Sequence, residues 1–170
     1  MLLLGNILSF SGCILMVILG FVKNKNRVLW YQCFQFVLMG SGHVYLGAPA
    51  GVVANIVSIL RNITFLKFKS TTWIKVGFIV LQAGLTMLSG MSNPIEWLPV
   101  IAIVIFTWFV DSTSQVSFKV LNIVCQILWC VYDISYLNFA GFTFDLLSIV
   151  TNIMGIFLIR KAMGKNDTVS

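Results

Sequence analysis

Two stripes of polar residues in this chain have the same spacing, i, i+3 and i+7, which places each stripe along one face of a helix. The first stripe is Asn55, Ser58 and Asn62, and the second is Asp145, Ser148 and Asn152. Amide, hydroxyl and carboxylate groups hydrogen-bond small polar molecules, and a carboxylate also holds a proton or a cation. If neighbouring helices bring the stripes together, they predict a binding site for a small polar solute.

Four more side chains extend this candidate site. His43 and Asp133 are predicted to flank an outer vestibule, where plain solvation is the simpler account of both. Trp129 either packs against lipid and neighbouring helices or offers an aromatic platform to a ring or sugar. Arg61 either pairs with Asp111 or faces the site and binds an anionic group of the solute.

The same residues do not favour an enzyme, a metal site or a cofactor site. The single histidine has no clustered acids around it in the sequence, and the cysteines form no pair at metal-ligand spacing. The four cysteines, Cys13, Cys33, Cys125 and Cys130, are better explained as small packed side chains. No stretch resembles a nucleotide-binding loop, so transport by this chain would be facilitated or ion-coupled, not driven by ATP.

The composition indicates which elements position these residues. Of the 170 residues, 59% are hydrophobic and only 9% are charged, whereas about a quarter are charged in a soluble domain. Seven apolar stretches are long enough to cross the ~30 Å core of a bilayer. They are residues 2–22, 28–46, 48–68, 72–91, 95–111, 117–136 and 140–160. The sequence therefore predicts an all-α integral membrane protein with seven transmembrane helices and the lipid bilayer as its partner.

The basic residues predict its orientation. Ten of the eleven lysines and arginines fall in loops that seven alternating spans place on one side, and the exception is Arg61. Because basic loops remain in the cytoplasm, we expect the amino terminus outside the membrane and the carboxyl terminus in the cytoplasm. The net charge of +6 then reflects these loops and contact with anionic lipid, and it gives no reason to expect nucleic acid as a partner.

The chain also repeats itself. Residues 43–68 align with residues 133–158 at a constant offset of 90 without a gap. The identical pairs are Ala50/Ala140, Gly51/Gly141, Ser58/Ser148, Ile59/Ile149, Asn62/Asn152 and Ile63/Ile153. Two three-span copies are parallel only if an odd number of spans separates them. The predicted organisation is a three-helix repeat at 1–70, a linker helix at 71–92, a second three-helix repeat at 93–161 and a cytoplasmic tail at 162–170.

Under a two-fold axis normal to the membrane, the two polar stripes face each other across a central cavity. Asn62 and Asn152 are expected near midplane, with Asn55 and Asp145 toward the outside. The serines between them serve either the cavity or simple helix packing, since hydroxyl groups in membrane helices often bond a neighbouring helix.

Three stretches resemble a known family. The strings NIVSILRN (55–62), WCVYD (129–133) and DLLSIVTNIMGIFLIRK (145–161) resemble the YgjV-type bacterial inner membrane proteins, over most of the chain. The 3+1+3 plan also resembles the SWEET sugar transporters and the PnuC-type nicotinamide riboside transporters. In SWEET-like proteins, paired asparagines and a nearby tryptophan surround the substrate, which implies that role for Asn62 and Asn152. The chain lacks the Pro-Gln dipeptide of those relatives, so sugar specificity does not carry over.

Two functions remain open from the sequence. The first is a transporter of a polar small molecule, such as a sugar, nucleoside or vitamin-like compound, by alternating access between the repeats. The alternative is a membrane-embedded binding or interaction protein, a receptor or complex subunit, that uses the same cavity without transport. A homo-oligomer is compatible with either. The identity of the solute and of any coupling ion does not follow from these residues.

Overall fold

In the computed structural model, the chain is a bundle of α-helices. The structure describes residues 1–19, 21–89, 93–111 and 114–167, and within these ranges it contains seven α-helices and no strand. They are α1 (Leu2–Leu19), α2 (Lys25–Leu46), α3 (Pro49–Lys67), α4 (Thr72–Leu88), α5 (Trp97–Phe109), α6 (Gln115–Ser135) and α7 (Phe139–Asp167), with a short 3-10 helix, η1 (Pro94–Glu96), before α5. The prediction of an all-α chain with seven helices is confirmed.

Local signals explain where these helices begin. Asn24, Thr71 and Ser114 precede α2, α4 and α6, and each side-chain oxygen accepts a hydrogen bond from a backbone N–H of the first helical turn. Such caps satisfy donors that have no partner within the helix. Helix α3 begins instead with Pro49, whose ring fixes φ near the helical value. Its missing N–H costs nothing at this position, because the first N–H groups of a helix have no partner within it.

The α2–α3 and α6–α7 turns have the same backbone geometry. Each contains a residue with positive φ, Gly47 at 67° and Leu137 at 57°. In each turn the next N–H donates to the carbonyl oxygen five residues earlier, from Ala48 to His43 (3.0 Å) and from Asn138 to Asp133 (2.9 Å). Positive φ suits glycine and is unusual for leucine. We call the end of the bundle that these turns form the turn end.

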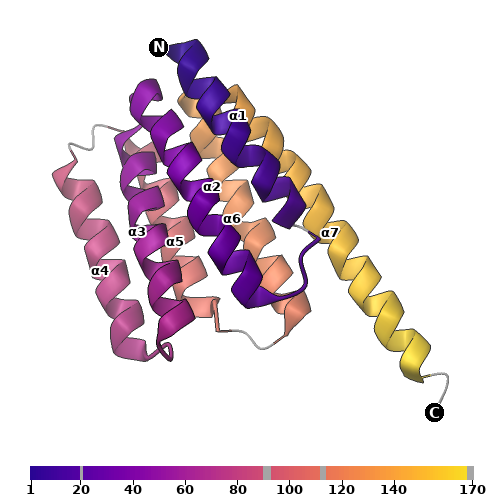
Figure 1. Cartoon of the computed structure of the whole chain (residues 1–170). Helices are drawn as coiled ribbons and strands as arrows, with labels where there is room; N and C mark the ends of the chain where they lie inside the picture. The colour runs from indigo at the N-terminus through magenta and orange to yellow at the C-terminus, as the bar shows by residue number, and fades with distance from the viewer. Residues whose placement is uncertain (20, 90–92, 112–113, 168–170) are drawn as a thin grey trace.

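The helices pack as a closed ring with one helix outside it. Helix α1 contacts α2 and α7, α2 contacts α3, α3 contacts α5, α5 contacts α6, and α6 contacts α7. Helix α4 packs against α3 and α5 at the edge of the bundle, as Figure 1 shows, and α7 lies at the opposite edge, where its carboxyl-terminal part extends beyond the other helices. The centre of the ring is where side chains from all six helices converge.

The outer surface of the bundle is apolar. Four helices are long and apolar enough to cross a membrane, namely α1, α3, α6 and residues 139–162 of α7, and the helices at 72–88 and 94–109 are shorter but also apolar. Large hydrophobic side chains such as Phe10, Trp73, Leu88 and Phe157 are exposed on them. An outward-facing apolar belt of this kind suits lipid and not water.

The basic residues gather at the end opposite the turn end, which we call the basic end. It includes Lys23, Lys25, Arg27, Lys67, Lys69 and Arg160. Here Lys75 Nζ lies 2.7 Å from Asp111 Oδ2 and donates to the backbone oxygen of Trp108. An apolar core of α2, α5 and α6 residues, including Leu29 and Phe106, packs toward this end. The four cysteines are buried and form no disulfide, which confirms their interpretation as packed side chains.

Candidate functional site

Polar side chains surround a row of small hollows in the middle of the bundle. Three adjoining hollows share the walls made by Gln35 of α2 and Gln126 of α6. We name them by one distinctive residue each: the Asp145 hollow, the Arg61 hollow and the Asn152 hollow. A water molecule needs roughly 10–15 Å³ of space for its centre, so spaces of a few tens of Å³ hold several waters or a small solute.

The Asp145 hollow lies nearest the turn end. Its volume is about 40 Å³, and its wall includes Met39, Asn55, Trp129 and Asp145. The Asp145 carboxyl group is 1% exposed, and its Oδ2 atom has no hydrogen-bond partner in the part of the chain that the structure describes. A buried carboxyl oxygen without a partner lowers the stability of the protein. A proton, a cation or a polar solute would satisfy it.

The Arg61 hollow, of about 50 Å³, adjoins it and is also lined by Ser58, Gln32 and Asn122. Arg61 is 2% exposed. Its guanidinium donates to Asn62 Oδ1 from Nη2 (2.9 Å) and Nε (3.2 Å), and its Cζ atom lies 4.3 Å from the centre of the Phe106 ring. All of these partners are uncharged.

The alternative in which Arg61 pairs with Asp111 is therefore wrong. Asp111 lies at the basic end, where it forms its ion pair with Lys75. The other interpretation, in which Arg61 faces the interior, agrees with its place in the wall of the hollow. The buried guanidinium remains available to an anionic group that enters the hollow.

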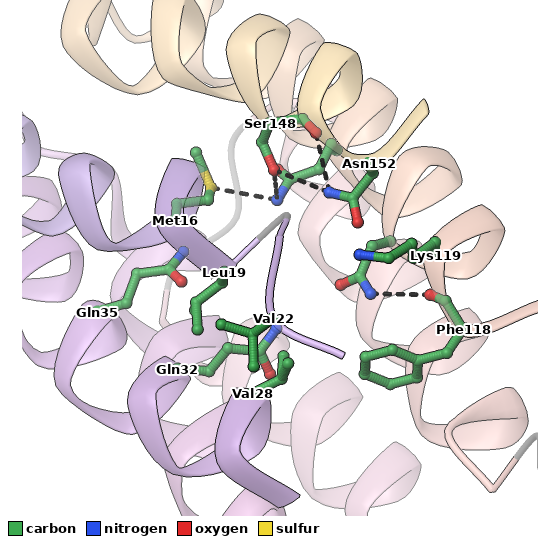
Figure 2. Close-up of a pocket in the computed structure, with 12 residues that line it drawn as sticks. Met16, Leu19, Val22, Val28, Gln32, Gln35, Phe118, Lys119, Ser148 and Asn152 are labelled. Atoms are coloured by element: carbon green, nitrogen blue, oxygen red, sulfur yellow. Dashed lines mark hydrogen bonds between the residues drawn. The ribbon is translucent and has the colours of Figure 1, made fainter. Parts of the chain in front are cut away.

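The Asn152 hollow continues toward the basic end, with a volume of about 20 Å³. Figure 2 shows Gln32 and Gln35 on one side of it and Ser148 and Asn152 on the other. Asn152 Nδ2 donates to the backbone oxygen of Ser148 (2.8 Å), which leaves its amide oxygen free to accept. Lys119 is also in this wall. The two sides come from the helices α1 and α2 and from α6 and α7, respectively.

The row reaches the basic end through a fourth hollow of about 50 Å³. Val22, Phe118 and Lys119 line both it and the Asn152 hollow, and its own wall adds Lys23 and Lys25. Four small hollows therefore follow one another from the level of Asp145 to the basic loops. Their polar lining would be expensive to maintain in a helix bundle that only packs against itself.

A hydrogen-bonded pair closes the row at the turn end. His43 Nε2 lies 3.0 Å from Asp133 Oδ1, and both side chains are completely buried. Asn55 Nδ2 contacts His43 Nδ1 (3.1 Å) and also donates to the backbone oxygen of Gly51 (2.7 Å). Since the second bond fixes the amide nitrogen as the donor, His43 Nδ1 accepts, and Nε2 carries the proton that bonds Asp133.

Solvation is thus the wrong account of His43 and Asp133. Both lie near helix ends in the sequence, but each faces inward and bonds the other half of the bundle. The ring of Trp129 packs beside His43, with centroids 5.8 Å apart, and the Tyr132 hydroxyl accepts from the Gly51 N–H at 2.8 Å. In the part of the chain that the structure describes, these buried side chains pack directly against one another at the turn end.

Two glycines allow this close approach. A methyl group at Gly51 would lie 2.9 Å from the His43 ring, and one at Gly141 would overlap Asp133 Oδ2 and Asn138 Nδ2. Real Cβ contacts are longer than this. The identical glycines of the sequence repeat therefore each fit against one member of the His43–Asp133 pair.

We expect Gly141→Ala to destabilise the protein by about 1–3 kcal/mol, because the added methyl group forces Asp133 and Asn138 away from their positions. Gly84→Ala is the matched control, since no atom lies within 4 Å of the methyl group it adds. Thermal unfolding of the purified variants measures both. Equal stability of the two variants would contradict the close packing at Gly141.

A second polar contact holds the turn end together. The Tyr136 hydroxyl, just beyond α6, donates to Glu96 Oε1 of η1 at 2.7 Å. Burial, and then the hydrogen bond and charge of Glu96, raise the pKa of Tyr136 to about 12. The phenol therefore keeps its proton at physiological pH and ties the start of α5 to the α6–α7 turn.

The structure groups most of the residues that the sequence singled out, in three sets. Asn55, Asp145 and Trp129 line one hollow, Ser58, Arg61 and Trp129 the next, and Ser148 and Asn152 the third. Asn62 is placed differently: it is fully buried and its amide bonds Arg61, the backbone oxygen of Leu29 and Gln32 Oε1. Through Gln32 it supports the wall that faces Asn152.

Sequence reasoning missed four amide-bearing residues of the walls. They are Gln32, Gln35, Asn122 and Gln126. One signal could have identified part of the set, because Gln32 and Asn122 are separated by the repeat offset of 90. Gln32 and Gln35 also lower the hydropathy of α2, which is not among the four strongly apolar helices.

An apolar exterior, several helices that can cross a bilayer and a polar interior define a helical integral membrane protein. The model of the Imp-YgjV family, bacterial inner membrane proteins, matches residues 3–163. The chain belongs to this family, as its sequence strings indicated, and its place is the bacterial inner membrane. No curated protein and no solved structure matches the chain, so the likeness to SWEET and PnuC proteins stays a prediction from the sequence.

Proposed function

We propose that the protein carries a small polar solute across the inner membrane by alternating access between two three-helix units. The observation that carries this proposal is the row of polar hollows along the middle of the bundle, which the His43–Asp133 pair closes at one end. A route that is closed at one end and hollow toward the other is what one state of an alternating-access carrier requires.

Features shared by the two halves support the duplication on which this mechanism depends. The positive φ values fall at residues 47 and 137, and the same backbone hydrogen bond follows each. A two-fold axis between the first three helices and the last three would relate α1 to α5 and α3 to α7. The contact between α1 and α7 would then be equivalent to the contact between α5 and α3, and both contacts are present. In this arrangement α4 is the linker helix.

The positive-inside rule gives the proposed carrier its direction. The basic end is expected in the cytoplasm, because nearly all lysines and arginines lie there. The turn end, closed by His43 and Asp133, then faces outward. The described state corresponds to a carrier that is closed to the outside, and the opposite state requires the pair to separate.

The lining predicts the kind of solute. Amide groups of Gln35 and Gln126 lie in all three central hollows and offer both donors and acceptors, while Trp129 offers a flat apolar face. Asn152 and Ser148 contribute from α7, and Asn62 holds the opposite wall. Such a wall suits a compact polar molecule more than a lipid or a large apolar compound.

Binding and flux together test the proposal. The purified protein should gain thermal stability with a subset of sugars, nucleosides, vitamins and amino acids, and vesicles containing it should accumulate the same compound. Asn152→Ala should weaken that binding, whereas Thr64→Ala, on the exposed side of α3, should not. Binding without flux would favour the receptor or complex subunit instead, and hits that survive Asn152→Ala and Gln126→Ala would overturn the site.

A further inference from the structure

Two buried ionisable groups of opposite charge line the central hollows, and neither has a charged partner. In the described part of the chain, His43 hydrogen-bonds Asp133 and Lys75 forms an ion pair with Asp111, and neither contact includes Arg61 or Asp145. Both side chains are at least 98% buried. An isolated charge in a membrane interior is costly, so its retention calls for a partner that the protein itself does not supply.

Arg61 is aligned for an anion. Its guanidinium is held by Asn62 Oδ1 and by Thr107 Oγ1 (3.4 Å), and it lies over the Phe106 ring. Neutral partners fix its position without neutralising its charge, which is the arrangement that suits recognition of a carboxylate or a similar group. Gln32 strengthens the arrangement because it accepts a hydrogen bond from Asn62.

Asp145 is placed for a cation at the other end of the same space. Its buried Oδ2 has no hydrogen-bond partner among the described residues, and it lines its hollow together with Asn55 and Trp129. The face of an indole ring attracts an ammonium group, so Trp129 adds to the attraction of the carboxylate. The repeat-equivalent residue, Asn55, is neutral and already bonded to His43 and Gly51.

The two hollows are continuous in their lining. Gln35, Phe36, Gln126 and Trp129 belong to both walls. Asn55, beside Asp145, and Arg61 are six residues apart on α3, a rise of about 9 Å along the helix axis. One small molecule can therefore reach both groups only if its own charges are separated by several bonds.

We propose that the solute is a zwitterion whose anionic group binds Arg61 and whose amino group binds Asp145, with Gln35 and Gln126 bonding the segment between them. The class that fits is a small amino acid with its two charges on opposite ends, such as an ω-amino acid. This inference rests on the proposed function, because it names the substrate class of the same cavity.

A matched set of three probes tests it on the full-length protein: 4-aminobutanoate, butanoate and butylamine. We expect 4-aminobutanoate to bind about 10-fold more tightly than either single-charge probe. In Asp145→Asn the zwitterion should lose its advantage over butanoate, and in Arg61→Gln it should lose its advantage over butylamine. Calorimetry on protein in lipid nanodiscs measures these ratios. Asp111→Asn, which removes a carboxylate that is 43% exposed and lines none of the hollows, is the control and should keep both ratios.

A series on the unmodified protein makes the test independent of whether the variants fold. Affinity should change with the number of carbons between amine and carboxylate, from three to six, and pass through a maximum. A flat series, or zwitterions no better than single-charge probes, would overturn the proposal. If a neutral sugar or nucleoside instead binds and is carried, with Asp145→Asn and Arg61→Gln unchanged, transport stands and the zwitterion inference fails.

Discussion

Asp133→Ala should lower the free energy of unfolding by about 1–3 kcal/mol, because it leaves the Nε2–H of the buried, neutral His43 imidazole without its acceptor. For a chain of this length, that loss corresponds to a fall of several degrees in the unfolding temperature. The effect is large because both groups are completely buried, away from the bulk solvent that could supply another acceptor. Thermal unfolding in detergent measures it.

Two further variants, one at this pair and one at the basic end, show whether the lost hydrogen bond causes the destabilisation. Asp133→Asn keeps an oxygen that accepts from His43, so most of the stability should return. Asp111→Ala removes the partner of Lys75 at a site where the carboxylate is 43% exposed, and it should cost only about 0.2–1 kcal/mol. If Asp133→Ala were no worse than Asp111→Ala, the His43–Asp133 pair would not hold the turn end closed.

In contrast to Asp133→Ala, Asp145→Leu should raise the free energy of unfolding by about 1–3 kcal/mol. It should also abolish binding of the solute. The reason is that the Asp145 carboxyl group is buried, and its Oδ2 has no hydrogen-bond partner among the described residues. The adjoining hollow gives the leucine side chain room. A group that costs stability and serves binding is expected at a functional site.

The repeat provides its matched control. Asn55 is equivalent to Asp145, but its amide bonds His43 Nδ1 and the Gly51 backbone oxygen. Asn55→Leu should therefore destabilise the protein by about 2–3 kcal/mol. Chemical denaturation of the two variants shows whether each substitution raises or lowers the free energy of unfolding. Destabilisation of the same size in both would mean that Asp145 has a structural partner and is no binding group.

The helices were predictable because each is a long apolar run bounded by polar or basic residues. The predicted span at 48–68 and the observed α3 (Pro49–Lys67) differ by one residue at each end. The predicted span at 95–111 is less accurate, since Pro94–Glu96 form a 3-10 turn before α5 begins at Trp97. Short 3-10 turns are frequent at the ends of α-helices, and an apolar run does not show where the α-helical turns begin.

The orientation of side chains was harder to predict than the helices. His43 and Asp133 lie near helix ends, which suggests solvent, but the depth of a residue along a helix does not reveal which face it occupies. Their burial depends on Gly51 and Gly141, which let helices approach closely. That dependence involves residues on different helices, so only the assembled bundle makes it visible.

The asparagines illustrate the same limit. Asn62 and Asn152 are equivalent in the sequence. However, Asn62 follows Arg61, and its amide oxygen accepts two hydrogen bonds from the Arg61 guanidinium. At the equivalent position before Asn152 stands Thr151, whose hydroxyl bonds the Ser148 backbone. The repeat in the sequence therefore predicts which helix faces turn toward the hollows, and local differences between the copies decide which hydrogen bonds each face makes.

The most direct test of alternating access measures the reactivity of one cysteine from each side of the membrane. Cys125 lines the Arg61 hollow and is 7% exposed. In a variant with Cys13, Cys33 and Cys130 replaced by alanine, a membrane-impermeant thiol reagent should label Cys125 in inverted vesicles and hardly at all in right-side-out vesicles. Adding Gly141→Ala, which displaces Asp133, should raise labelling from the outside. Equal labelling from both sides, or none from the cytoplasmic side, would contradict a cavity that opens inward and is closed by the His43–Asp133 pair.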